Sequence, residues 1–232
     1  MMKSLLGKKN ETVKSFEDAK SFEFKRKMSM NDLQHFAELM GTEDLARVES
    51  EYFQDLILYI LSGYPDIVFK GGTALRKFWN AERFSADLDF VGNIPENILD
   101  DLLVKLSQRG YPTRISEIRE YGDGNITVKL AIRGIVYLYH HVTIDLFPTS
   151  PVTLPPRSKQ LVSIFPDIPA FTIPVMSPTE TLAEKIRTLF SRDNPQDLHD
   201  VSFLLDVVSP DWQLVKDKFE YDGLTFSLDE LR

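Results

Sequence analysis

The sequence predicts a mixed α/β protein with a largely helical C-terminal part. Apolar residues recur at helical spacing before residue 63 and alternate at strand spacing between 126 and 147, and helix-start motifs follow a segment with six prolines at 148–169. Prolines interrupt regular structure, so we expect the boundary between two regions in that segment. Residues 1–150 would form the core with its N-terminal helices. Residues 151–232 would form a Pro-rich connection and a helical region that packs on the core.

The composition excludes several classes of protein. The chain has 232 residues, 43% of them hydrophobic, and a formal net charge of −8. No apolar run reaches the roughly 18 residues that span a bilayer, and residues 1–10 are not followed by the apolar stretch of a secretory signal. Cysteine is absent, which excludes disulfides, thiolate metal sites and cysteine nucleophiles. We expect a cytoplasmic enzyme or binding protein without membrane contact.

The N-terminal quarter has a helical pattern. Residues 1–27 are polar and charged, and we expect an irregular arm and the start of a helix. Apolar residues then keep helical spacing from Met28 to about Gly63. Gly41 is a plausible stop within this stretch, and Thr42 looks like the N-cap of a second helix.

The middle of the chain alternates between short strands and helices. Short apolar runs and strict alternation predict strands at 66–69, 87–91, 126–132, 139–147 and 172–176. Helices are expected at 73–79 and from about Pro95 to Gln108, where Gly110 fits a left-handed stop. The Pro-rich segment should be a loop with little regular structure.

The C-terminal part begins with a helix-start motif. Ser177-Pro178-Thr179-Glu180 places Ser at the N-cap, Pro at the first helical position and Glu at the third, which predicts a capping box. This helix should run to about Ser191. Asn194-Pro195 should open another helix that ends near Val208.

A glycine pair follows the first predicted strand. Gly71-Gly72-Thr73 stands at a strand-to-helix corner, where backbone N–H groups and the helix dipole can receive a phosphate. Most such glycine pairs are simple turns, so this corner alone is weak evidence for a phosphate-binding site.

Two aspartates lie one residue apart on the next predicted strand. Asp87 and Asp89 would share a face, and two such close carboxylates repel unless a cation lies between them. Mg²⁺, or Mn²⁺ in its place, suits such oxygen ligands and bridges to substrate phosphates. Two solvated aspartates on an edge strand are the alternative.

Together these two motifs resemble a known signature. Fourteen residues separate Gly72 from Asp87, and Lys70-Gly71-Gly72-Thr73 with Phe84-Ser85-x-Asp87-Leu88-Asp89-Phe90 resembles the AbiEii/AbiGii toxin family, which includes MenT-type toxins. The family belongs to the nucleotidyltransferase superfamily. The resemblance therefore implies a polymerase-β-like core, with a mixed sheet flanked by helices and a helical C-terminal region.

The resemblance also implies further site residues on later elements. Asp145 would be a third carboxylate, although a strand-end aspartate capping a neighbouring backbone is the alternative. The family has a Lys-containing helix, an Arg, and an Asp-x-x-Asp helix, which here correspond to Lys185, Arg192, Asp197 and Asp200. Where the family often has an Arg before the first of these aspartates, this chain has Gln196.

The activity implied by the resemblance is transfer of a nucleoside monophosphate from an NTP to a hydroxyl. Asp87, Asp89 and Asp145 would hold two Mg²⁺, and Asp145 would also assist deprotonation of the acceptor. The nucleotide would contact the residues Gly71, Gly72, Thr73, Lys185, Arg192 and Asp200. The implied acceptor is RNA, with a tRNA 3′ end favoured, and the implied partner is an antitoxin. Alternatives are a protein acceptor, or a nucleotide-binding partner protein without turnover.

The net charge of −8 argues against indiscriminate nucleic-acid binding. Several basic residues nevertheless fall in or beside the motifs. They are Lys70, Arg76, Lys77, Arg83, Lys185 and Arg192. We expect a local basic cleft on an acidic body.

Overall fold

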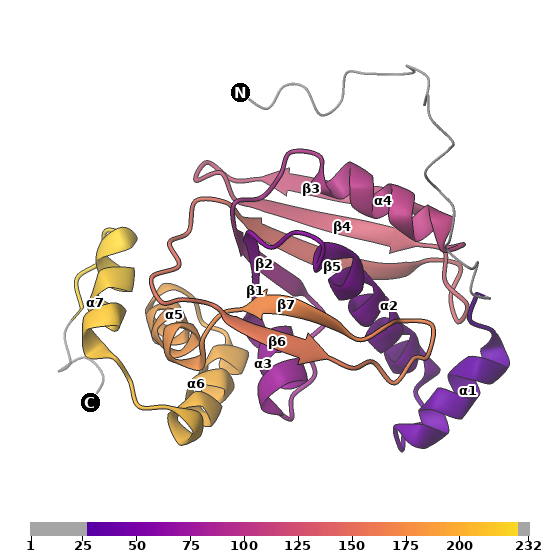
Figure 1. Ribbon diagram of the computed structural model, residues 1–232. Helices are drawn as coiled ribbons and strands as arrows, with labels where there is room; N and C mark the ends of the chain where they lie inside the picture. The colour runs from indigo at the N-terminus through magenta and orange to yellow at the C-terminus, as the bar shows by residue number, and fades with distance from the viewer. Residues whose placement is uncertain (1–26, 227–232) are drawn as a thin grey trace.

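Seven strands form one mixed sheet in the computed structural model, which describes residues 27–226 (Figure 1). The strands are β1 (Ile67–Lys70), β2 (Leu88–Gly92), β3 (Thr113–Glu120), β4 (Ile126–Ile132), β5 (His140–Phe147), β6 (Arg157–Leu161) and β7 (Phe171–Val175). Their order is β3-β4-β5-β2-β1-β7-β6. Strand β2 pairs in parallel with β5 and β1 pairs in parallel with β7, whereas the other neighbours are antiparallel. The predicted α/β class with a mixed sheet is confirmed.

The register at the centre of the sheet brings three charged residues side by side. Asp89 on β2 lies opposite Asp145 on β5 and opposite Lys70 on β1. Because side chains directly opposite each other point to the same face, the two carboxylates and the ammonium share one face of the sheet. Buried Leu88 and Phe90 alternate with Asp89 and hold this register through the core.

The described residues also form seven helices. They are α1 (Met30–Leu39), α2 (Leu45–Leu61), α3 (Gly71–Trp79), α4 (Ile98–Gln108), α5 (Pro178–Ser191), α6 (Pro195–Val207) and α7 (Trp212–Tyr221). None of them is long and apolar enough to cross a membrane.

The N-terminal helices follow the expected break at Gly41, whose φ is +63°. The expected N-cap at Thr42 was wrong. Asp44 caps α2 instead, since its carboxylate accepts a hydrogen bond from the Arg47 backbone N–H at 3.1 Å. The predicted arm lies outside the described residues, apart from Lys27.

Three elements were not predicted from the sequence, namely β3, β6 and α7. Strands β3 and β6 are the two edges of the sheet, and most of their side chains are exposed. Strand β6 falls within the segment that was expected to be an irregular loop. Both strands owe their conformation to pairing with a neighbour, β4 and β7 respectively, rather than to a hydrophobic pattern of their own.

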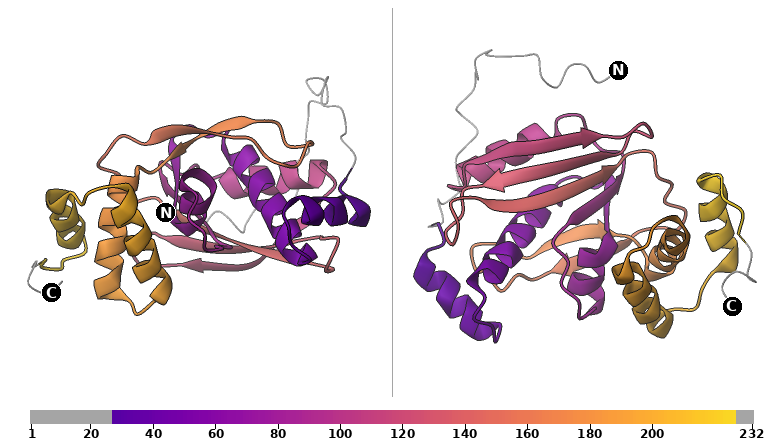
Figure 2. Two further views of the ribbon diagram at one scale, coloured as in Figure 1. Left: turned by 90° about the horizontal axis from the view of Figure 1, so that it is seen from below. Right: turned by 180° about the vertical axis from the view of Figure 1, so that it is seen from behind.

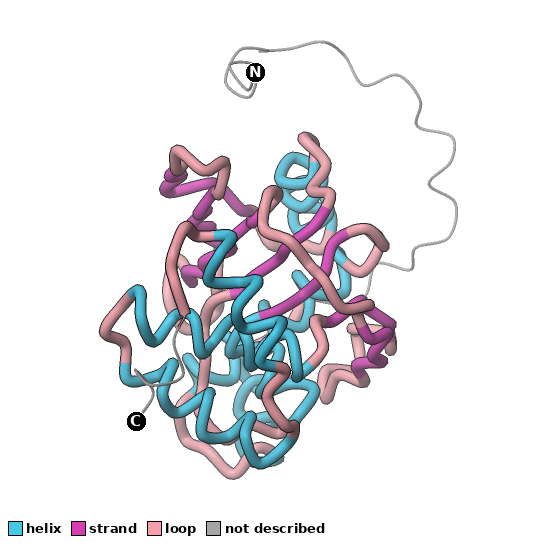
Figure 3. Tube along the Cα trace, turned by 90° about the vertical axis from the view of Figure 1, so that its left-hand side faces the viewer, coloured by secondary structure: helices cyan, strands magenta, loops and turns pink. Residues whose placement is uncertain are grey.

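Two large hydrophobic clusters fill most of the described interior, and a third, formed by Val68, Val91 and Met176, is separate from them. The larger one extends from Met28 to Val175 and packs the sheet against α1, α2 and α4. The smaller one joins α5, α6 and α7 and includes Leu75 of α3 and Ala81, which anchor it to the sheet domain. These three helices lie at one end of the molecule and α1 at the other (Figure 2). Figure 3 looks onto the helical end. The division at residue 150 stays a prediction, and β6 and β7 beyond it complete the sheet.

The start of α5 was predicted correctly, but its capping box is only half formed. The Ser177 hydroxyl caps the helix by accepting from the Glu180 backbone N–H at 3.2 Å. The Glu180 carboxylate does not return to the N-cap. It is fully buried and accepts hydrogen bonds from the backbone N–H groups of Thr153 and Leu154, both 2.7 Å away, and from the Lys218 ammonium at 2.6 Å. Glu180 therefore ties the Pro-rich segment and α7 to α5.

Candidate active site

The corner between β1 and α3 is built by two glycines. Gly71 has φ +79°, and a Cβ there would lie 2.7 Å from the Asp89 Cγ and overlap its carboxylate oxygen. At Gly72 a Cβ would lie 3.0 Å from the Arg83 Cζ and 3.1 Å from the Ser85 Oγ. The corner therefore leaves room for two charged side chains, and the N-terminal N–H groups of α3 point to the same region.

Thr73, the third residue of the corner, has its side chain turned inward. It is fully buried, and its hydroxyl donates to the carbonyl oxygens of Asp87 at 2.6 Å and Ser85 at 3.2 Å. Gln54 of α2 donates to the Ser85 carbonyl from the other side, at 2.9 Å. The Thr73 hydroxyl thus holds the loop that leads into β2, and its backbone N–H remains the group that could meet a phosphate.

The three predicted carboxylates lie close together. Asp89 and Asp145 are register partners on neighbouring parallel strands, and exposed Asp87 precedes β2 by one residue. Burial and the negative charges of Asp145 and Asp87 raise the pKa of Asp89 to about 7, against the opposing effect of Lys70 and Lys185. Burial and the charge of Asp87 also raise the pKa of Asp145. The site therefore carries negative charge that it does not itself neutralise.

Thr127 of β4 supports this carboxylate cluster. It lies opposite Asp145 in the antiparallel pair, and its hydroxyl donates a hydrogen bond to the Asp145 Oδ1. This bond opposes the rise of the Asp145 pKa, because it favours the ionised form. No role was predicted for Thr127, although its place in a strictly alternating strand puts it on the polar face.

The donor set fits a magnesium ion that is completed by its substrate. Among the described residues, no group of three or more acidic, histidine or cysteine side chains is placed so that it could hold a metal ion. Mg²⁺ usually binds to one or two carboxylates and takes its remaining ligands from substrate phosphates and water. The adjacent Asp89 and Asp145, with their unneutralised charge, meet that requirement.

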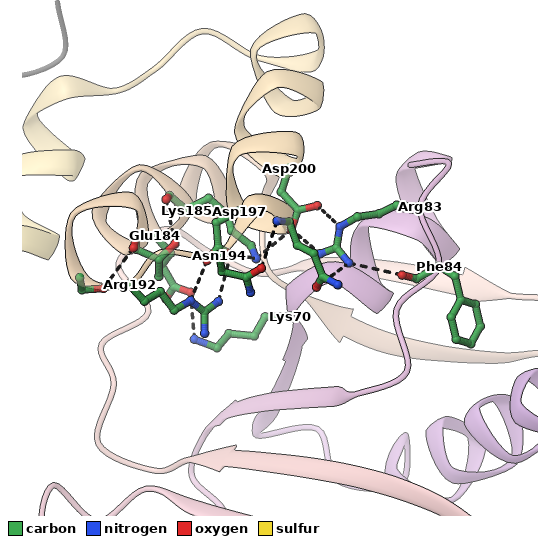
Figure 4. A network of polar contacts seen from close by, with 12 residues as sticks. Lys70, Arg83, Phe84, Glu184, Lys185, Arg192, Asn194, Asp197 and Asp200 are labelled. Atoms are coloured by element: carbon green, nitrogen blue, oxygen red, sulfur yellow. Dashed lines mark hydrogen bonds and ion pairs between the residues drawn. The ribbon is translucent and has the colours of Figure 1, made fainter.

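A chain of alternating charges crosses from the corner to α6 (Figure 4). We call it the charge chain; its members in order are Arg83, Asp200, Lys185, Asp197 and Arg192. The Lys185 ammonium lies 2.8 Å from both carboxylates, which are 1% exposed. Each carboxylate is held on its other side by a guanidinium, at 2.6 Å.

These contacts keep both carboxylates of the charge chain ionised. Burial opposes ionisation, but hydrogen bonds from Arg192 and Lys185 hold the pKa of Asp197 below its usual value. Hydrogen bonds from Arg83 and Lys185 do the same for Asp200. The chain carries three cations and two anions, so one positive charge remains beside the carboxylate cluster.

The placement of Arg192 differs in detail from the expectation. It was expected to share a helical stripe with Lys185, but α5 ends at Ser191 and Arg192 is its extended C-cap residue. The two cations meet nonetheless, because both donate to Asp197. Asp197 and Asp200 are neighbours on α6, as expected. Gln196 contributes its amide oxygen, which accepts from Arg83 at 3.3 Å.

Lys70 connects the sheet to α5. Its ammonium lies 2.9 Å from the Glu184 carboxylate and 4.4 Å from the centre of the Phe147 ring. Glu184 also lies 3.5 Å from Lys218 of α7, and the charges of Lys70 and Lys218 outweigh burial and lower the pKa of Glu184. The sequence shows Lys70 as one of several basic residues near the motifs, but no local pattern pairs it with Glu184, which lies 114 residues away.

The expected basic cleft is smaller than predicted. Arg76 and Lys77 of α3 point toward α2, where they pair with Glu51, and Lys77 also pairs with Asp55 at 2.6 Å. All four side chains are largely buried. These two cations neutralise buried carboxylates in the core and contribute nothing to a surface beside Asp87.

Enzymes that transfer a nucleotidyl group bring a triphosphate next to carboxylates that carry metal ions. The corner between β1 and α3, with Asp89 beside it and Lys185 opposite, is suited to that task. The protein is a nucleotidyltransferase. It belongs to the family described as nucleotidyl transferase AbiEii toxin of type IV toxin–antitoxin systems, whose profile matches residues 58–232. The predicted resemblance is thereby confirmed.

The solved structure of MenT4 agrees on the fold. MenT4, a nucleotidyltransferase toxin from Mycobacterium tuberculosis H37Rv, is 24% identical with a TM-score of 0.63, covering 80% of this chain and 68% of that one. JHP933 from Helicobacter pylori is 20% identical with a TM-score of 0.48, covering 70% of this chain and 66% of that one. A comparison with curated proteins gives no match.

Proposed function

We propose that the protein transfers a nucleoside monophosphate from an NTP to a hydroxyl of RNA, with a tRNA 3′ end as the favoured acceptor. The reaction would depend on Mg²⁺ and take place in the cytoplasm. The observation that carries the proposal is the pairing of Asp89 with Asp145 across parallel strands, directly beside the Gly71 corner. Membership of a toxin–antitoxin family indicates an antitoxin as the partner.

In this reaction a bond forms between the acceptor oxygen and the α-phosphorus. The bond from that phosphorus to the β-phosphate oxygen breaks, and pyrophosphate leaves. Asp87, Asp89 and Asp145 would hold Mg²⁺, which when bound neutralises the charge that develops on the phosphates. Asp145, whose carboxylate accepts a hydrogen bond from the Thr127 hydroxyl, would also assist deprotonation of the acceptor hydroxyl.

The nucleotide phosphates would lie between the corner and the charge chain. The backbone N–H groups of Gly71, Gly72 and Thr73 begin α3, where the helix dipole favours anions. An ammonium has three donors, and the contacts of Lys185 with Asp197 and Asp200 use two of them, so one remains for a phosphate oxygen. Arg192, whose side chain is 55% exposed, would supply a second cation from the solvent side.

Label transfer from α-labelled NTP tests the proposal. Total RNA and total protein would be offered together, and the fraction that gains label identifies the acceptor. Asp89→Asn and Asp145→Asn should each abolish transfer, whereas Asp123→Asn, in an exposed turn, should leave it unchanged. Thermal unfolding would confirm that the variants fold.

Three results would contradict the proposal in different ways. Normal transfer by both carboxylate variants would refute the mechanism. Label in protein alone would refute an RNA acceptor and support a protein-modifying transferase. Tight NTP binding without pyrophosphate release, across acceptors, would support a binding protein without turnover.

A further inference from the structure

Arg83 occupies the space above Gly72 that a side chain would fill. It lies in the loop between α3 and β2, outside the residues expected to bind nucleotide. A Cβ at Gly72 would approach the Arg83 Cζ to 3.0 Å, so glycine at this position makes room for the guanidinium. The negative charge of Asp89 also acts on Arg83, which places the guanidinium near the carboxylate cluster.

The Arg83 guanidinium donates two hydrogen bonds to one carboxylate of α6. Its Nε donates to the Asp200 Oδ1 and its Nη2 donates to the Asp200 Oδ2, each at 2.6 Å (Figure 4). The Arg83 side chain is 14% exposed and that of Asp200 is 1% exposed. Two parallel bonds from a planar fork fix the plane of a carboxylate, which a single bond cannot do.

Asp200 passes this constraint on to Lys185. The same Oδ2 that accepts from Arg83 lies 2.8 Å from the Lys185 ammonium. On the other side of the ammonium, Asp197 is fixed in an equivalent way by Arg192, with bonds of 2.6 and 3.0 Å. The position of Lys185 is therefore set by two carboxylates, each of which is oriented by a guanidinium.

We propose that Arg83 is a positioning residue for the nucleotide, which holds Asp200 and thereby places Lys185 against the phosphates. The same contact fastens α6 to the Gly72 corner. The inference rests on the proposed function, since it requires that Lys185 faces the triphosphate.

Loss of Arg83 would leave Asp200 as a buried carboxylate with Lys185 as its one remaining charged partner in the charge chain. The ammonium would be drawn toward Asp200 and away from the phosphates, so nucleotide affinity should fall. If instead Arg83 touched the phosphates directly, its loss would have the same effect whether or not Asp200 carried a charge. A double-mutant cycle separates these two roles.

The experiment is calorimetric titration of the full chain with each of the four ribonucleoside triphosphates, in MgCl₂ and again in EDTA. Arg83→Gln should weaken binding about tenfold, the usual size of a lost charge-assisted hydrogen bond. In the Asp200→Asn background the same substitution should change affinity by less than about twofold. Arg83→Lys, which keeps the charge without the fork, should fall between wild type and Arg83→Gln. In label transfer the KM for NTP should rise while kcat stays nearly constant.

Arg187→Gln is the matched control. It removes one positive charge, as Arg83→Gln does, but from α5, where Arg187 pairs with Asp222 at the surface. It should bind nucleotide as the wild type does. If Arg83→Gln does not fold, Arg83→Lys in both backgrounds completes the cycle. Equal losses in both Asp200 backgrounds, or no loss in either, would overturn the inference.

The outcomes also separate this inference from the proposed function. Wild-type protein that binds NTP but labels no acceptor would refute the proposed function, and the affinity cycle would still decide the role of Arg83. Equal losses in both backgrounds with normal label transfer would refute the role of Arg83 alone. Absence of NTP binding by the wild type would refute both.

Discussion

Gly71→Ala should displace the carboxylate of Asp89 and thereby inactivate the enzyme. The added methyl group would lie 2.7 Å from the Asp89 Cγ and overlap the carboxylate oxygen. Asp89 lies on the central strand β2, and Gly71 is the first residue of α3, directly after the central strand β1. Either the Asp89 side chain must rotate away from Asp145 or the corner must shift. A displacement of about 1 Å at a reacting group can reduce the rate about 100-fold.

The cost in stability has two parts. An L-residue other than glycine at φ +79° loses about 1–2 kcal/mol, and forcing a methyl group into an occupied space costs about 1–3 kcal/mol. Gly71→Ala should therefore lower the free energy of unfolding by about 2–5 kcal/mol.

Gly41→Ala is the matched control. Gly41 has a similar φ of +63°, but a Cβ there would meet nothing within 4 Å. It should show the conformational cost of about 1–2 kcal/mol alone, with normal label transfer. Urea unfolding and transfer from α-labelled NTP measure both effects. Equal destabilisation by the two substitutions, with normal transfer by Gly71→Ala, would refute the reasoning.

Three further predictions concern charged groups and their supports. Asp89→Asn should stabilise the metal-free protein, kept in EDTA, above about pH 7, because burial and the neighbouring carboxylate of Asp145 raise the native pKa of Asp89 to about 7 from its usual value of 3.8. The free energy of unfolding of the wild type should then fall by at most about 4 kcal/mol as the pH rises from about 4 to about 7. Thermal unfolding in EDTA should show no such loss for the variant. Lys218→Met should lower the free energy of unfolding in urea by about 3–5 kcal/mol, because it leaves buried Glu180 without its cation, and adding Glu180→Gln should restore much of the loss. Thr127→Val should shift the rising limb of the activity–pH profile to higher pH. The Thr127 hydroxyl stabilises the ionised form of Asp145, so its removal raises the pKa of Asp145. An unshifted limb would contradict this role of Thr127.

Local sequence patterns were sufficient to predict the elements whose own residues form a buried face or a helix cap. The start of α5 at Ser177-Pro178 is encoded in adjacent residues, and the alternation in β4 and β5 reflects one buried face. The helix α7 carries the same kind of information. Its buried Leu214, Val215 and Phe219 have helical spacing, so it could have been predicted.

The edge strands could not be predicted in this way. Strand β3, with the sequence TRISEIRE, has a mostly exposed pattern and becomes a strand because β4 pairs with it over seven positions. Strand β6 follows Pro155 and Pro156, which indicate a loop, but an edge strand tolerates prolines at its start. In both cases the partner, rather than the segment itself, determines the conformation.

The site shows the same limit. Side-chain alternation put Asp89 on one face of its strand, and the resemblance to the family pointed to Asp145, which lies opposite it on β5. Asp87 was expected on the same strand as Asp89 but precedes β2 by one residue. The pairing of Arg83 with Asp200 joins residues 117 positions apart, and no local spacing encodes it. Contacts of this kind depend on how helices pack, which is decided by the whole fold.

The site is assembled from segments that lie far apart along the chain, from Gly71 at the corner to Asp200 on α6. During translation β2 and β5, which carry Asp89 and Asp145, emerge well before α6, and Lys185 gains its two carboxylate partners only when α6 is complete. An incomplete chain that ends before α6 would therefore lack the assembled charge chain. For a toxin, we expect that a chain released from a stalled ribosome before α6 lacks the proposed transfer activity.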